Sequence, residues 1–302
     1  MYNIPVKTES ACSKTDKKEI PMKKILALAL ALLMLFSLTA CASSKSAAPT
    51  DRLDQIKKAG VLQVATEPYF APYEFMDPSK EGQEAIMGAD VKIMEAIAKE
   101  IGVKLEIIPL DFTAVLTGIT TAKYDMAISA IAYSLERSEN MNLSNVYKAS
   151  DTGYGFIIRA EDAGKYNSIE DLKDAVVATQ SGSVQEGIYR TDVTDKGCKE
   201  LKLFAQMTDA YLAVQENRAD VCICSTDSAS LYAEANGGVL MVPDFRFTID
   251  PNMNGTVIAC PKENTDELIK VVNKVVEELK ANGSIDAWFE EAQQQAKELG
   301  VE

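Results

Sequence analysis

Short apolar runs alternate with helical patterns along the chain from residue 61 onward. The run at 61–66 predicts a buried strand, and the apolar spacing within 91–102 predicts an amphipathic helix. The alternation continues with a strand within 103–110, a helix within 113–122 and a strand within 124–130. Because strands and helices take turns along the chain, we expect an α/β fold.

Helix-end signals support this pattern. Ser168 and Ser183 each precede an acidic residue by three positions, a spacing typical of helix N-termini. Gly102 and Gly283 follow the last apolar positions of two helical patterns, where we expect helices to end. Near the C-terminus, apolar stripes at helical spacing predict core-facing helices, and they consist of Leu268, Val271, Val272, Val275, Val276 and Leu279, then Ile285, Trp288 and Phe289.

Two segments of the chain share a short pattern. LQVATEPY at 62–69 and AVVATQSG at 175–182 each end an apolar strand in Ala-Thr, turn through polar residues and lead toward a helix. Ligands of α/β sheets bind at the carboxyl ends of the strands. The repeat therefore predicts two α/β lobes, each with a binding loop after its first strand.

The segment from Met22 to Cys41 has two lysines, an apolar run over 25–38 and a small residue before the cysteine. It resembles a bacterial lipoprotein signal peptide. The resemblance implies removal of residues 22–40 and lipidation of Cys41 with a diacylglycerol and a further acyl chain such as palmitate, which anchors a protein stably. The alternative is an uncleaved helical anchor. Both interpretations place the rest of the chain outside the cytoplasm.

The residues on either side of this segment have no apolar pattern. Residues 1–21 are polar and carry Glu9, Asp16 and Glu19 upstream of the signal-like lysines, which indicates an extension from a start site assigned too early. Residues 41–50 are rich in Ser, Ala and Pro and predict a flexible tether. We expect the folded part to begin near Asp51.

Charge and composition limit the classes of partner. The net charge of −14 argues against nucleic acid and anionic lipid headgroups as partners. The chain contains no histidine, which removes the Ser-His-Asp and Cys-His nucleophile systems and the commonest metal ligand. We therefore expect no metal, no cofactor and no enzymatic chemistry.

The cysteines beyond Cys41 form no recognisable pattern. They are Cys198, Cys222, Cys224 and Cys260, with no CxxC pair. Cys222 and Cys224 share one face of a predicted strand, which is a poor geometry for a mutual disulfide. We expect buried free thiols rather than a disulfide framework or a metal site.

Five segments, in order, resemble the substrate-binding proteins of polar amino acid ABC importers, which form family 3 of the bacterial extracellular solute-binding proteins. The resemblance covers about residues 51–295 and rests on 60–75, 88–112, 123–147, 176–187 and 217–232. It implies a two-lobed periplasmic-binding-protein fold. The implied first lobe comprises 51–150 plus 255–302, the second comprises 154–247, and the hinge crossovers lie near 150–154 and 245–255.

The resemblance also implies a function. The chain would be a lipid-anchored extracytoplasmic protein that captures a small amino acid or related carboxylate and delivers it to an ABC permease and its ATPase. Closure of the lobes around the ligand would create the form that the permease recognises.

Arg137 matches the family's carboxylate-binding arginine, and a planar guanidinium suits that anion better than lysine does. The loop at 129–132, including Ala130 and Ala132, would add backbone N–H groups, although Ala132 lacks the usual hydroxyl. Ser183 falls where the family has a hydroxyl at a helix N-terminus and is also a good N-cap. Without the family context, Arg137 would be interpreted as a solvated helix residue.

Three further positions match the side-chain region of the ligand. Phe70 and Phe112 correspond to two aromatic residues that enclose the ligand side chain, and we expect Phe112 in a loop that faces the cleft. Phe75 is expected inside the lobe. Gln180 could recognise the ligand side chain by hydrogen bonds, or it could simply be exposed to solvent.

The sequence departs from the family where the ligand ammonium is held. Ser225 stands at the position of the usual carboxylate, and the nearest acid, Asp227, comes two residues later. A desolvated ammonium without a carboxylate is costly. Three explanations stay open. A shift of the local loop brings Asp227 to the ligand ammonium, Glu67 from the first lobe binds the ammonium instead, or the ligand has no free α-ammonium.

Two other classes use related scaffolds. Some dehydratases of prephenate-like acids share this fold, and Glu67 would be the candidate general acid. A receptor sensor domain would need a membrane helix and a signalling segment after the lobes.

Overall fold

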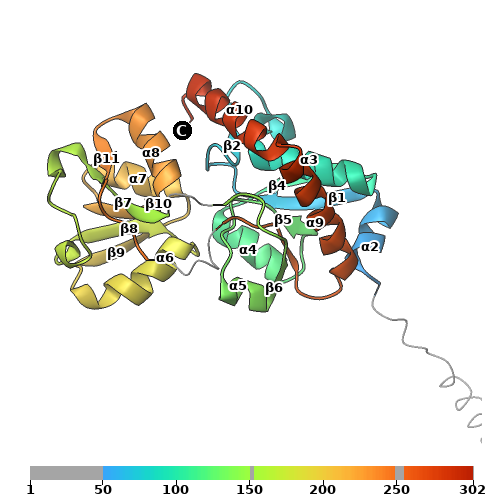
Figure 1. Cartoon of the computed structure of the whole chain (residues 1–302), viewed down its shortest axis with the longest axis horizontal. Coiled ribbons are helices and arrows are strands. Elements are labelled where there is room, and N and C mark those ends of the chain that lie inside the picture. The colour runs from blue at the N-terminus through green and yellow to red at the C-terminus, as the bar shows by residue number, and fades with distance from the viewer. Residues whose placement is uncertain (1–49, 150–152, 249–254, 302) are drawn as a thin grey trace, which may run out of the picture. The chain divides into compact units, whose positions relative to one another are not determined.

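The computed structural model describes residues 50–149, 153–248 and 255–301, and these residues form two five-stranded sheets. The sheets belong to two lobes, drawn as separate groups of strands in Figure 1. The first lobe has the strand order β4-β1-β5-β12-β6, and the second has the order β11-β7-β10-β8-β9. The expected α/β, two-lobed fold is confirmed. The predicted signal at 22–40 and Cys41 lie outside the described residues.

The first lobe is built from both ends of the described chain. Its strands are β1 (Val61–Thr66), β4 (Lys104–Pro109), β5 (Met126–Ala127), β6 (Met141–Leu143) and β12 (Ala259–Pro261), with a small sheet of β2 (Phe75–Met76) and β3 (Ile86–Met87). Its helices are α2 (Arg52–Ala59), α3 (Ala89–Ile101), α4 (Phe112–Thr120), α5 (Leu135–Asn140), α9 (Asp266–Ala281) and α10 (Ser284–Leu299), with the 3₁₀ turn η1 (Gly82–Ala85).

The second lobe is formed by the middle of the chain. Its strands are β7 (Tyr154–Arg159), β8 (Val176–Gln180), β9 (Glu200–Phe204), β10 (Val221–Ser225) and β11 (Val239–Met241). Its helices are α6 (Val184–Ile188), α7 (Met207–Gln215) and α8 (Thr226–Asn236). The short turns are η2 (Ala160–Asp162), η3 (Glu170–Leu172), the π-type η4 (Tyr189–Val193) and η5 (Thr194–Lys196).

Strand register brings equivalent strand ends together in each lobe. In the first lobe β1 is parallel to β4 and to β5, with Ala65 opposite both Ile108 and Ala127. In the second lobe β8 is parallel to β9 and to β10. The carboxyl ends of parallel strands lie at one edge of a sheet, so the loops after them gather there. This edge is where a ligand site is expected.

Each sheet has an apolar core on both faces. One face of the first sheet is covered by α3, α9 and α10, whose buried residues include Ile97, Val272 and Phe289. The other face packs on α4 through Val115 and Ile119. The second sheet has one core that includes Phe156 and another that holds α7 and α8. The C-terminal stripes are therefore core, as their periodicity predicts.

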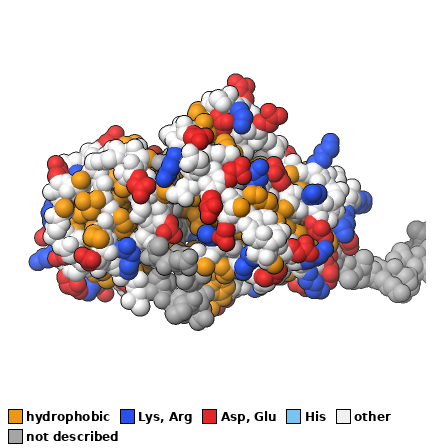
Figure 2. Space-filling view, turned by 45° about the horizontal axis from the view of Figure 1, so that its top comes forward, with side chains coloured by type: hydrophobic (Ala, Val, Ile, Leu, Met, Phe, Trp, Pro, Cys, Tyr) orange, Lys and Arg blue, Asp and Glu red, His pale blue; other side chains and the backbone are white. Residues whose placement is uncertain are grey.

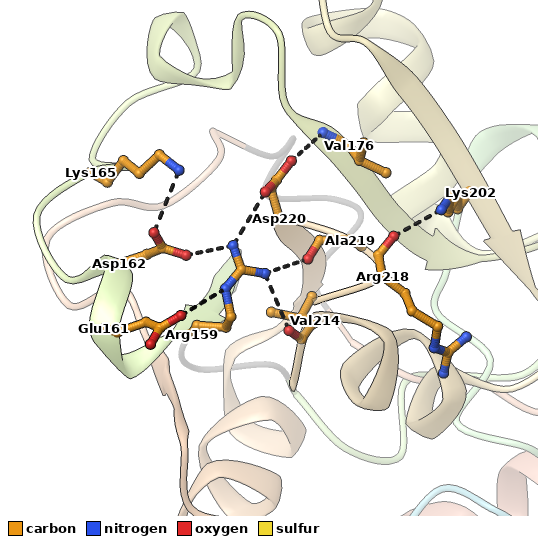
Figure 3. A network of polar contacts seen from close by, with 10 residues as sticks. All are labelled: Arg159, Glu161, Asp162, Lys165, Val176, Lys202, Val214, Arg218, Ala219 and Asp220. Atoms are coloured by element: carbon orange, nitrogen blue, oxygen red, sulfur yellow. Dashed lines mark hydrogen bonds and ion pairs between the residues drawn. The ribbon is translucent and has the colours of Figure 1, made fainter. Parts of the chain in front are cut away.

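A buried arginine ties three parts of the second lobe together (Figure 3). Arg159 ends β7 and is paired with Asp162 at 2.6 Å and with Asp220 at 3.2 Å. Its guanidinium also donates to the carbonyl of Ala219 at 2.6 Å, while Asp220 accepts the N–H of Val176 at 2.8 Å. The network fixes β7, β8 and the turn before β10 to one another, away from the carboxyl end of β10.

The lobes also meet outside their cores. Lys297 of α10 pairs with Glu234 of α8 at 3.6 Å. On the face drawn in Figure 2, acidic and basic side chains are interspersed over both lobes. The predicted crossovers near 150–154 and 245–255 fall largely outside the described residues. No described helix combines the length and apolar character that a membrane span requires.

Local sequence signals were mostly reliable. Ser183 caps α6 and accepts the N–H of Glu186 at 3.1 Å, and Gly102 ends α3 with a φ of 82°. Ser168 differs, because the turn that follows it is the three-residue η3 rather than a helix. Asp174 has a φ of 62° and β8 begins at Val176, which leaves no length for a helix.

Candidate functional site

Strand ends from both lobes surround a cavity of about 50 Å³. Its first-lobe wall includes the residues after β1 and β5, and its second-lobe wall includes the ends of β8 and β10. The lining residues are Glu67, Phe70, Tyr73, Glu74, Phe112, Ser129, Ala130, Ala132, Arg137, Tyr154, Gln180, Ser183, Val184, Gln185, Ser225, Gly255 and Thr256. The cavity is small because side chains from the two lobes meet across it.

Arg137 is the cation of this cavity. The helix α5 that carries it begins at the N-cap Ser134, whose hydroxyl accepts the Arg137 N–H at 3.1 Å. Its guanidinium donates to the carbonyl of Ala132 in the same lobe and to the carbonyl of Gly182 in the other lobe, the latter at 3.0 Å. The guanidinium carbon also lies 5.6 Å from the centre of the Phe112 ring, within cation–π range.

The Arg137 side chain has the charge and the free donors to bind an anion. Burial lowers its pKa to about 10, so it stays a cation at neutral pH. A guanidinium has five N–H donors in a planar fork, so the two carbonyl contacts leave donors that can bind a planar carboxylate.

Glu67 is a buried acid on the wall of the cavity. It follows directly after β1 and is only 2% exposed. Its Oε2 lies 3.4 Å from Nε2 of Gln180 in the other lobe, while no donor among the described residues reaches its Oε1. Burial raises the pKa of Glu67 to about 8; the Gln180 contact lowers it, and the charges of Asp111 and Asp209 raise it further.

The loop between β5 and α5 is held by side chains of the first lobe. Ser129 accepts the backbone N–H of Glu67 at 3.0 Å and donates to Glu74 at 3.0 Å. The N–H of Ala130 donates to Asp90 at 3.0 Å, and Ala130 has a φ of 45°, which is uncommon for a residue other than glycine. These contacts fix the loop that carries Ala130 and Ala132.

The second-lobe wall contributes neutral polar groups. Ser183 donates to the carbonyl of Gln180 at 2.6 Å and accepts the Glu186 N–H, so its capping role is established by its contacts. The amide of Gln180 also donates to the carbonyl of Ala205 at 3.1 Å. Ser225 is the last residue of β10 and lines the cavity.

Aromatic rings close the cavity on the first-lobe side. Phe70 stacks on Tyr73 with ring centres 5.7 Å apart and packs against an apolar cluster of the second lobe. Phe112 is 6% exposed and lies in the first turn of α4, rather than in a loop before the helix as expected. Asp111 is the N-cap of that helix and accepts the N–H of Ala114 at 2.9 Å. Phe75 is buried inside the lobe.

The structure brings together every residue that the sequence predicted to contact a ligand, except Asp227. These lining residues are Glu67, Phe70, Phe112, Ala130, Ala132, Arg137, Gln180, Ser183 and Ser225. Asp227 lies in the first turn of α8 and does not line the cavity. Contact of any of these residues with a ligand stays a prediction.

Sequence reasoning missed Glu74 and Tyr154. Glu74 is fully buried beside the cavity, between the aromatic residues Tyr73 and Phe75. An acid inside such an apolar stretch is a signal, because a carboxyl group is rarely buried without a specific role. Tyr154 begins β7 and is 8% exposed, but nothing in its local sequence distinguishes it from a core residue.

None of the four cysteines in the described part of the chain lines the cavity. Cys222, Cys224 and Cys260 are buried free thiols, as expected, whereas Cys198 is partly exposed. Across the described ranges, no group of histidine, cysteine and acidic side chains has the arrangement of a metal site.

Comparisons with known proteins agree with this architecture. The family described as bacterial extracellular solute-binding proteins, family 3, matches residues 62–293. The arginine-binding extracellular protein ArtP of Bacillus subtilis is 29% identical, over 89% of this chain and 98% of its own length.

Solved structures show the same similarity. The amino acid ABC transporter substrate-binding protein AbpA of Streptococcus pneumoniae, bound to L-arginine, superposes with a TM-score of 0.73 at 28% identity, covering 82% of this chain and 99% of that one. The ancestral amino acid-binding protein AncCDT-1, a precursor of cyclohexadienyl dehydratase, superposes with a TM-score of 0.68 at 27% identity, covering 80% and 99%.

Proposed function

The chain belongs to the bacterial extracellular solute-binding proteins of family 3, and from that membership we propose that it captures an amino acid outside the cytoplasm and delivers it to an ABC importer. Relatives named for arginine binding, and a solved relative bound to L-arginine, support an amino acid as the ligand. L-arginine is therefore the first ligand to test.

The observation that carries this proposal is the presence of one basic and one acidic side chain, Arg137 and Glu67, in one cavity. Arg137 offers donors for a carboxylate, and Glu67 offers a carboxyl oxygen that lacks a donor among the described residues. An amino acid carries both complementary groups. Ionised Glu67 would accept the ligand's cationic group and compensate for the neutral Ser225.

The same contacts suggest how the lobes respond to the ligand. Arg137 and Gly182, and Glu67 and Gln180, are contacts between the lobes. Arg137 and Glu67 both belong to the first lobe, and a ligand held by them that also contacts Gln180 or Ser225 of the second lobe would shift the population toward closure. The predicted crossovers near 150–154 and 245–255 would supply the hinge.

The attachment of the protein to the membrane is a separate part of the proposal. It rests on the sequence of residues 22–41, which resembles a lipoprotein signal. Lipidated Cys41, followed by the tether at 41–50, would keep the binding lobes near the permease and ATPase complex. The anchor would confine capture and delivery to the outer face of that membrane.

A thermal-shift screen of the mature protein against the common amino acids and their deaminated analogues tests the proposed ligand class. A ligand that binds only the folded state raises the unfolding temperature by mass action. We expect a shift with at least one amino acid, and none with its deaminated analogue at the same concentration. A shift with deaminated carboxylates alone would replace the amino acid by another class of carboxylate.

A further inference from the structure

Two buried acids belong to the first-lobe wall, and one of them, Glu74, lines the cavity. Glu74 and Asp90 are both fully buried and hold consecutive residues of one loop, since Ser129 donates to Glu74 and the N–H of Ala130 donates to Asp90. Two neighbouring buried carboxylates repel each other and offer only acceptors, and burial raises the pKa of both groups. We therefore expect one of the two carboxyl groups to carry a proton.

The surrounding donors decide which group carries it. Asp90 accepts the N–H of Ala130 at 3.0 Å and the hydroxyl of Tyr147 at 2.8 and 3.0 Å. Glu74 Oε1 accepts the hydroxyl of Ser129, whereas no donor among the described residues reaches its Oε2. Asp90 thus has the environment of a carboxylate, and Oε2 of Glu74 is the oxygen left to bear the proton.

We propose that Glu74 is a protonated positioning residue, which donates a hydrogen bond to Asp90 and thereby holds the ligand-contacting loop in place. The Glu67 N–H donates to Ser129, Ser129 donates to Glu74, and Asp90 accepts the Ala130 N–H; the proposed bond from Glu74 to Asp90 would join these contacts into one chain. It joins the end of β1 to the loop after β5. The positioning role rests on the proposed function, since it assumes that these residues contact the ligand.

The groups around Glu74 keep the proton in place. Asp90 comes from α3, Glu67 from the end of β1, and Tyr73 and Tyr147 are the neighbouring phenols. The acids are negative when ionised and the phenols are neutral at neutral pH, so none of them stabilises a Glu74 carboxylate by an opposite charge. Burial, with Asp90, raises the pKa of Glu74 well above its usual range.

Substitution of Glu74 separates this role from a merely structural one. Glu74→Gln keeps an N–H donor toward Asp90 and a carbonyl acceptor for Ser129, so it mimics the protonated acid. Glu74→Ala removes both. At pH 7, we expect the glutamine variant to bind L-arginine within about threefold of the parent, and the alanine variant to lose about tenfold or more, the cost of leaving buried groups without partners.

Two ligand-free measurements test the proton and the positioning independently of the ligand. Infrared spectroscopy at pH 7 detects the C=O stretch of a protonated carboxylic acid, and Glu67→Gln removes the contribution of Glu67. Burial also raises the pKa of Asp90, so the band is assigned to Glu74 by its loss on Glu74→Gln. We expect that variant to retain such a band, and the double variant with Glu74→Gln to lose it. Hydrogen exchange of residues 126–134 should match the parent in Glu74→Gln and be faster in Glu74→Ala.

Each outcome bears on a different claim. Loss of loop protection in Glu74→Gln to the level of Glu74→Ala would show that Glu74 acts as a carboxylate and would overturn the proposal. Unchanged protection of the loop in both variants would overturn the positioning role of Glu74. Absence of the infrared band would overturn the claim that Glu74 is protonated. If the ligand-free results are as expected and L-arginine does not bind, the choice of ligand is wrong, whereas the proposed pair of Glu74 and Asp90 is retained.

Discussion

Arg137 donates a hydrogen bond of 3.0 Å from Nη2 to the backbone carbonyl of Gly182, which belongs to the other lobe. The guanidinium thus lies at the boundary between the lobes and on the wall of the cavity at once. The same side chain therefore contacts the second lobe and can also bind the anion of a ligand.

Replacement of Arg137 should abolish most ligand binding. Loss of one partner of a buried charge pair costs about 2 to 5 kcal/mol, which corresponds to more than tenfold in affinity. Arg137→Lys should rescue little, because an ammonium lacks the planar fork. Calorimetric titration measures the effect, with Arg190→Ala as the control arginine because Arg190 is exposed. Parent-like affinity of Arg137→Lys would exclude the fork as the anchor.

Binding of a cationic ligand group at Glu67 should release a proton. The pKa of Glu67 is about 8 without ligand, so below that pH the group must ionise before it pairs with a cation. Affinity should rise with pH by up to about tenfold per unit and level off above pH 8. Titration in buffers of different ionisation enthalpy counts the proton, and an affinity unchanged between pH 6 and pH 9 would contradict its release.

The ligand-free protein provides the control for this titration. An acid whose pKa is raised by folding, here from 4.5 to about 8, is protonated in the folded state while the unfolded chain ionises. Its contribution to stability is complete below pH 4.5 and is lost as the pH rises toward 8. Glu67→Gln should remove this part of the pH dependence of the free energy of unfolding.

Replacement of Arg159, the buried arginine of the second lobe, should destabilise the fold although Arg159 does not line the cavity. Arg159→Met leaves Asp162, Asp220 and the carbonyl of Ala219 without their shared donor. Breaking such a buried network costs about 3 to 5 kcal/mol. Denaturant unfolding measures this loss, and Arg218→Ala is the matched control because its side chain is about half exposed. A difference below 1 kcal/mol would contradict a structural role for the network.

The membrane attachment can be tested at one residue. Cys41→Ser should leave an unprocessed precursor or release the protein from the membrane fraction, because the acyl chains supply the anchor. Fractionation and gel mobility distinguish these outcomes from the parent. A variant that fractionates and migrates like the parent would rule out lipidation of Cys41.

The sequence predicted the order of strands and helices well because periodicity is a local property. The strand at Val61–Thr66 and the helix at Ala89–Ile101 follow from apolar spacing within one element. The turn after Ser168 was predicted less well, because a serine–acid signal marks a possible helix start without giving the length that follows.

The site was predicted only as far as the resemblance reached. The lining position of Arg137 followed from a motif, whereas the position of Glu74 depends on contacts with Ser129 and Asp90, far away in sequence. The choice between Glu67 and Asp227 was also open, because it depends on how the start of α8 is placed relative to the other lobe. Such relations arise from tertiary packing and leave no local pattern.

The most direct test of the central claim is a calorimetric titration of three proteins with the amino acid that gives the largest thermal shift. They are the parent, Glu67→Gln and Asp227→Asn, two isosteric changes that each remove one acid. We predict that Glu67→Gln loses more than about tenfold in affinity, because the ligand cation then lacks its carboxylate, and that Asp227→Asn binds within about threefold of the parent. Retained affinity in Glu67→Gln together with loss in Asp227→Asn would contradict the assignment of Glu67.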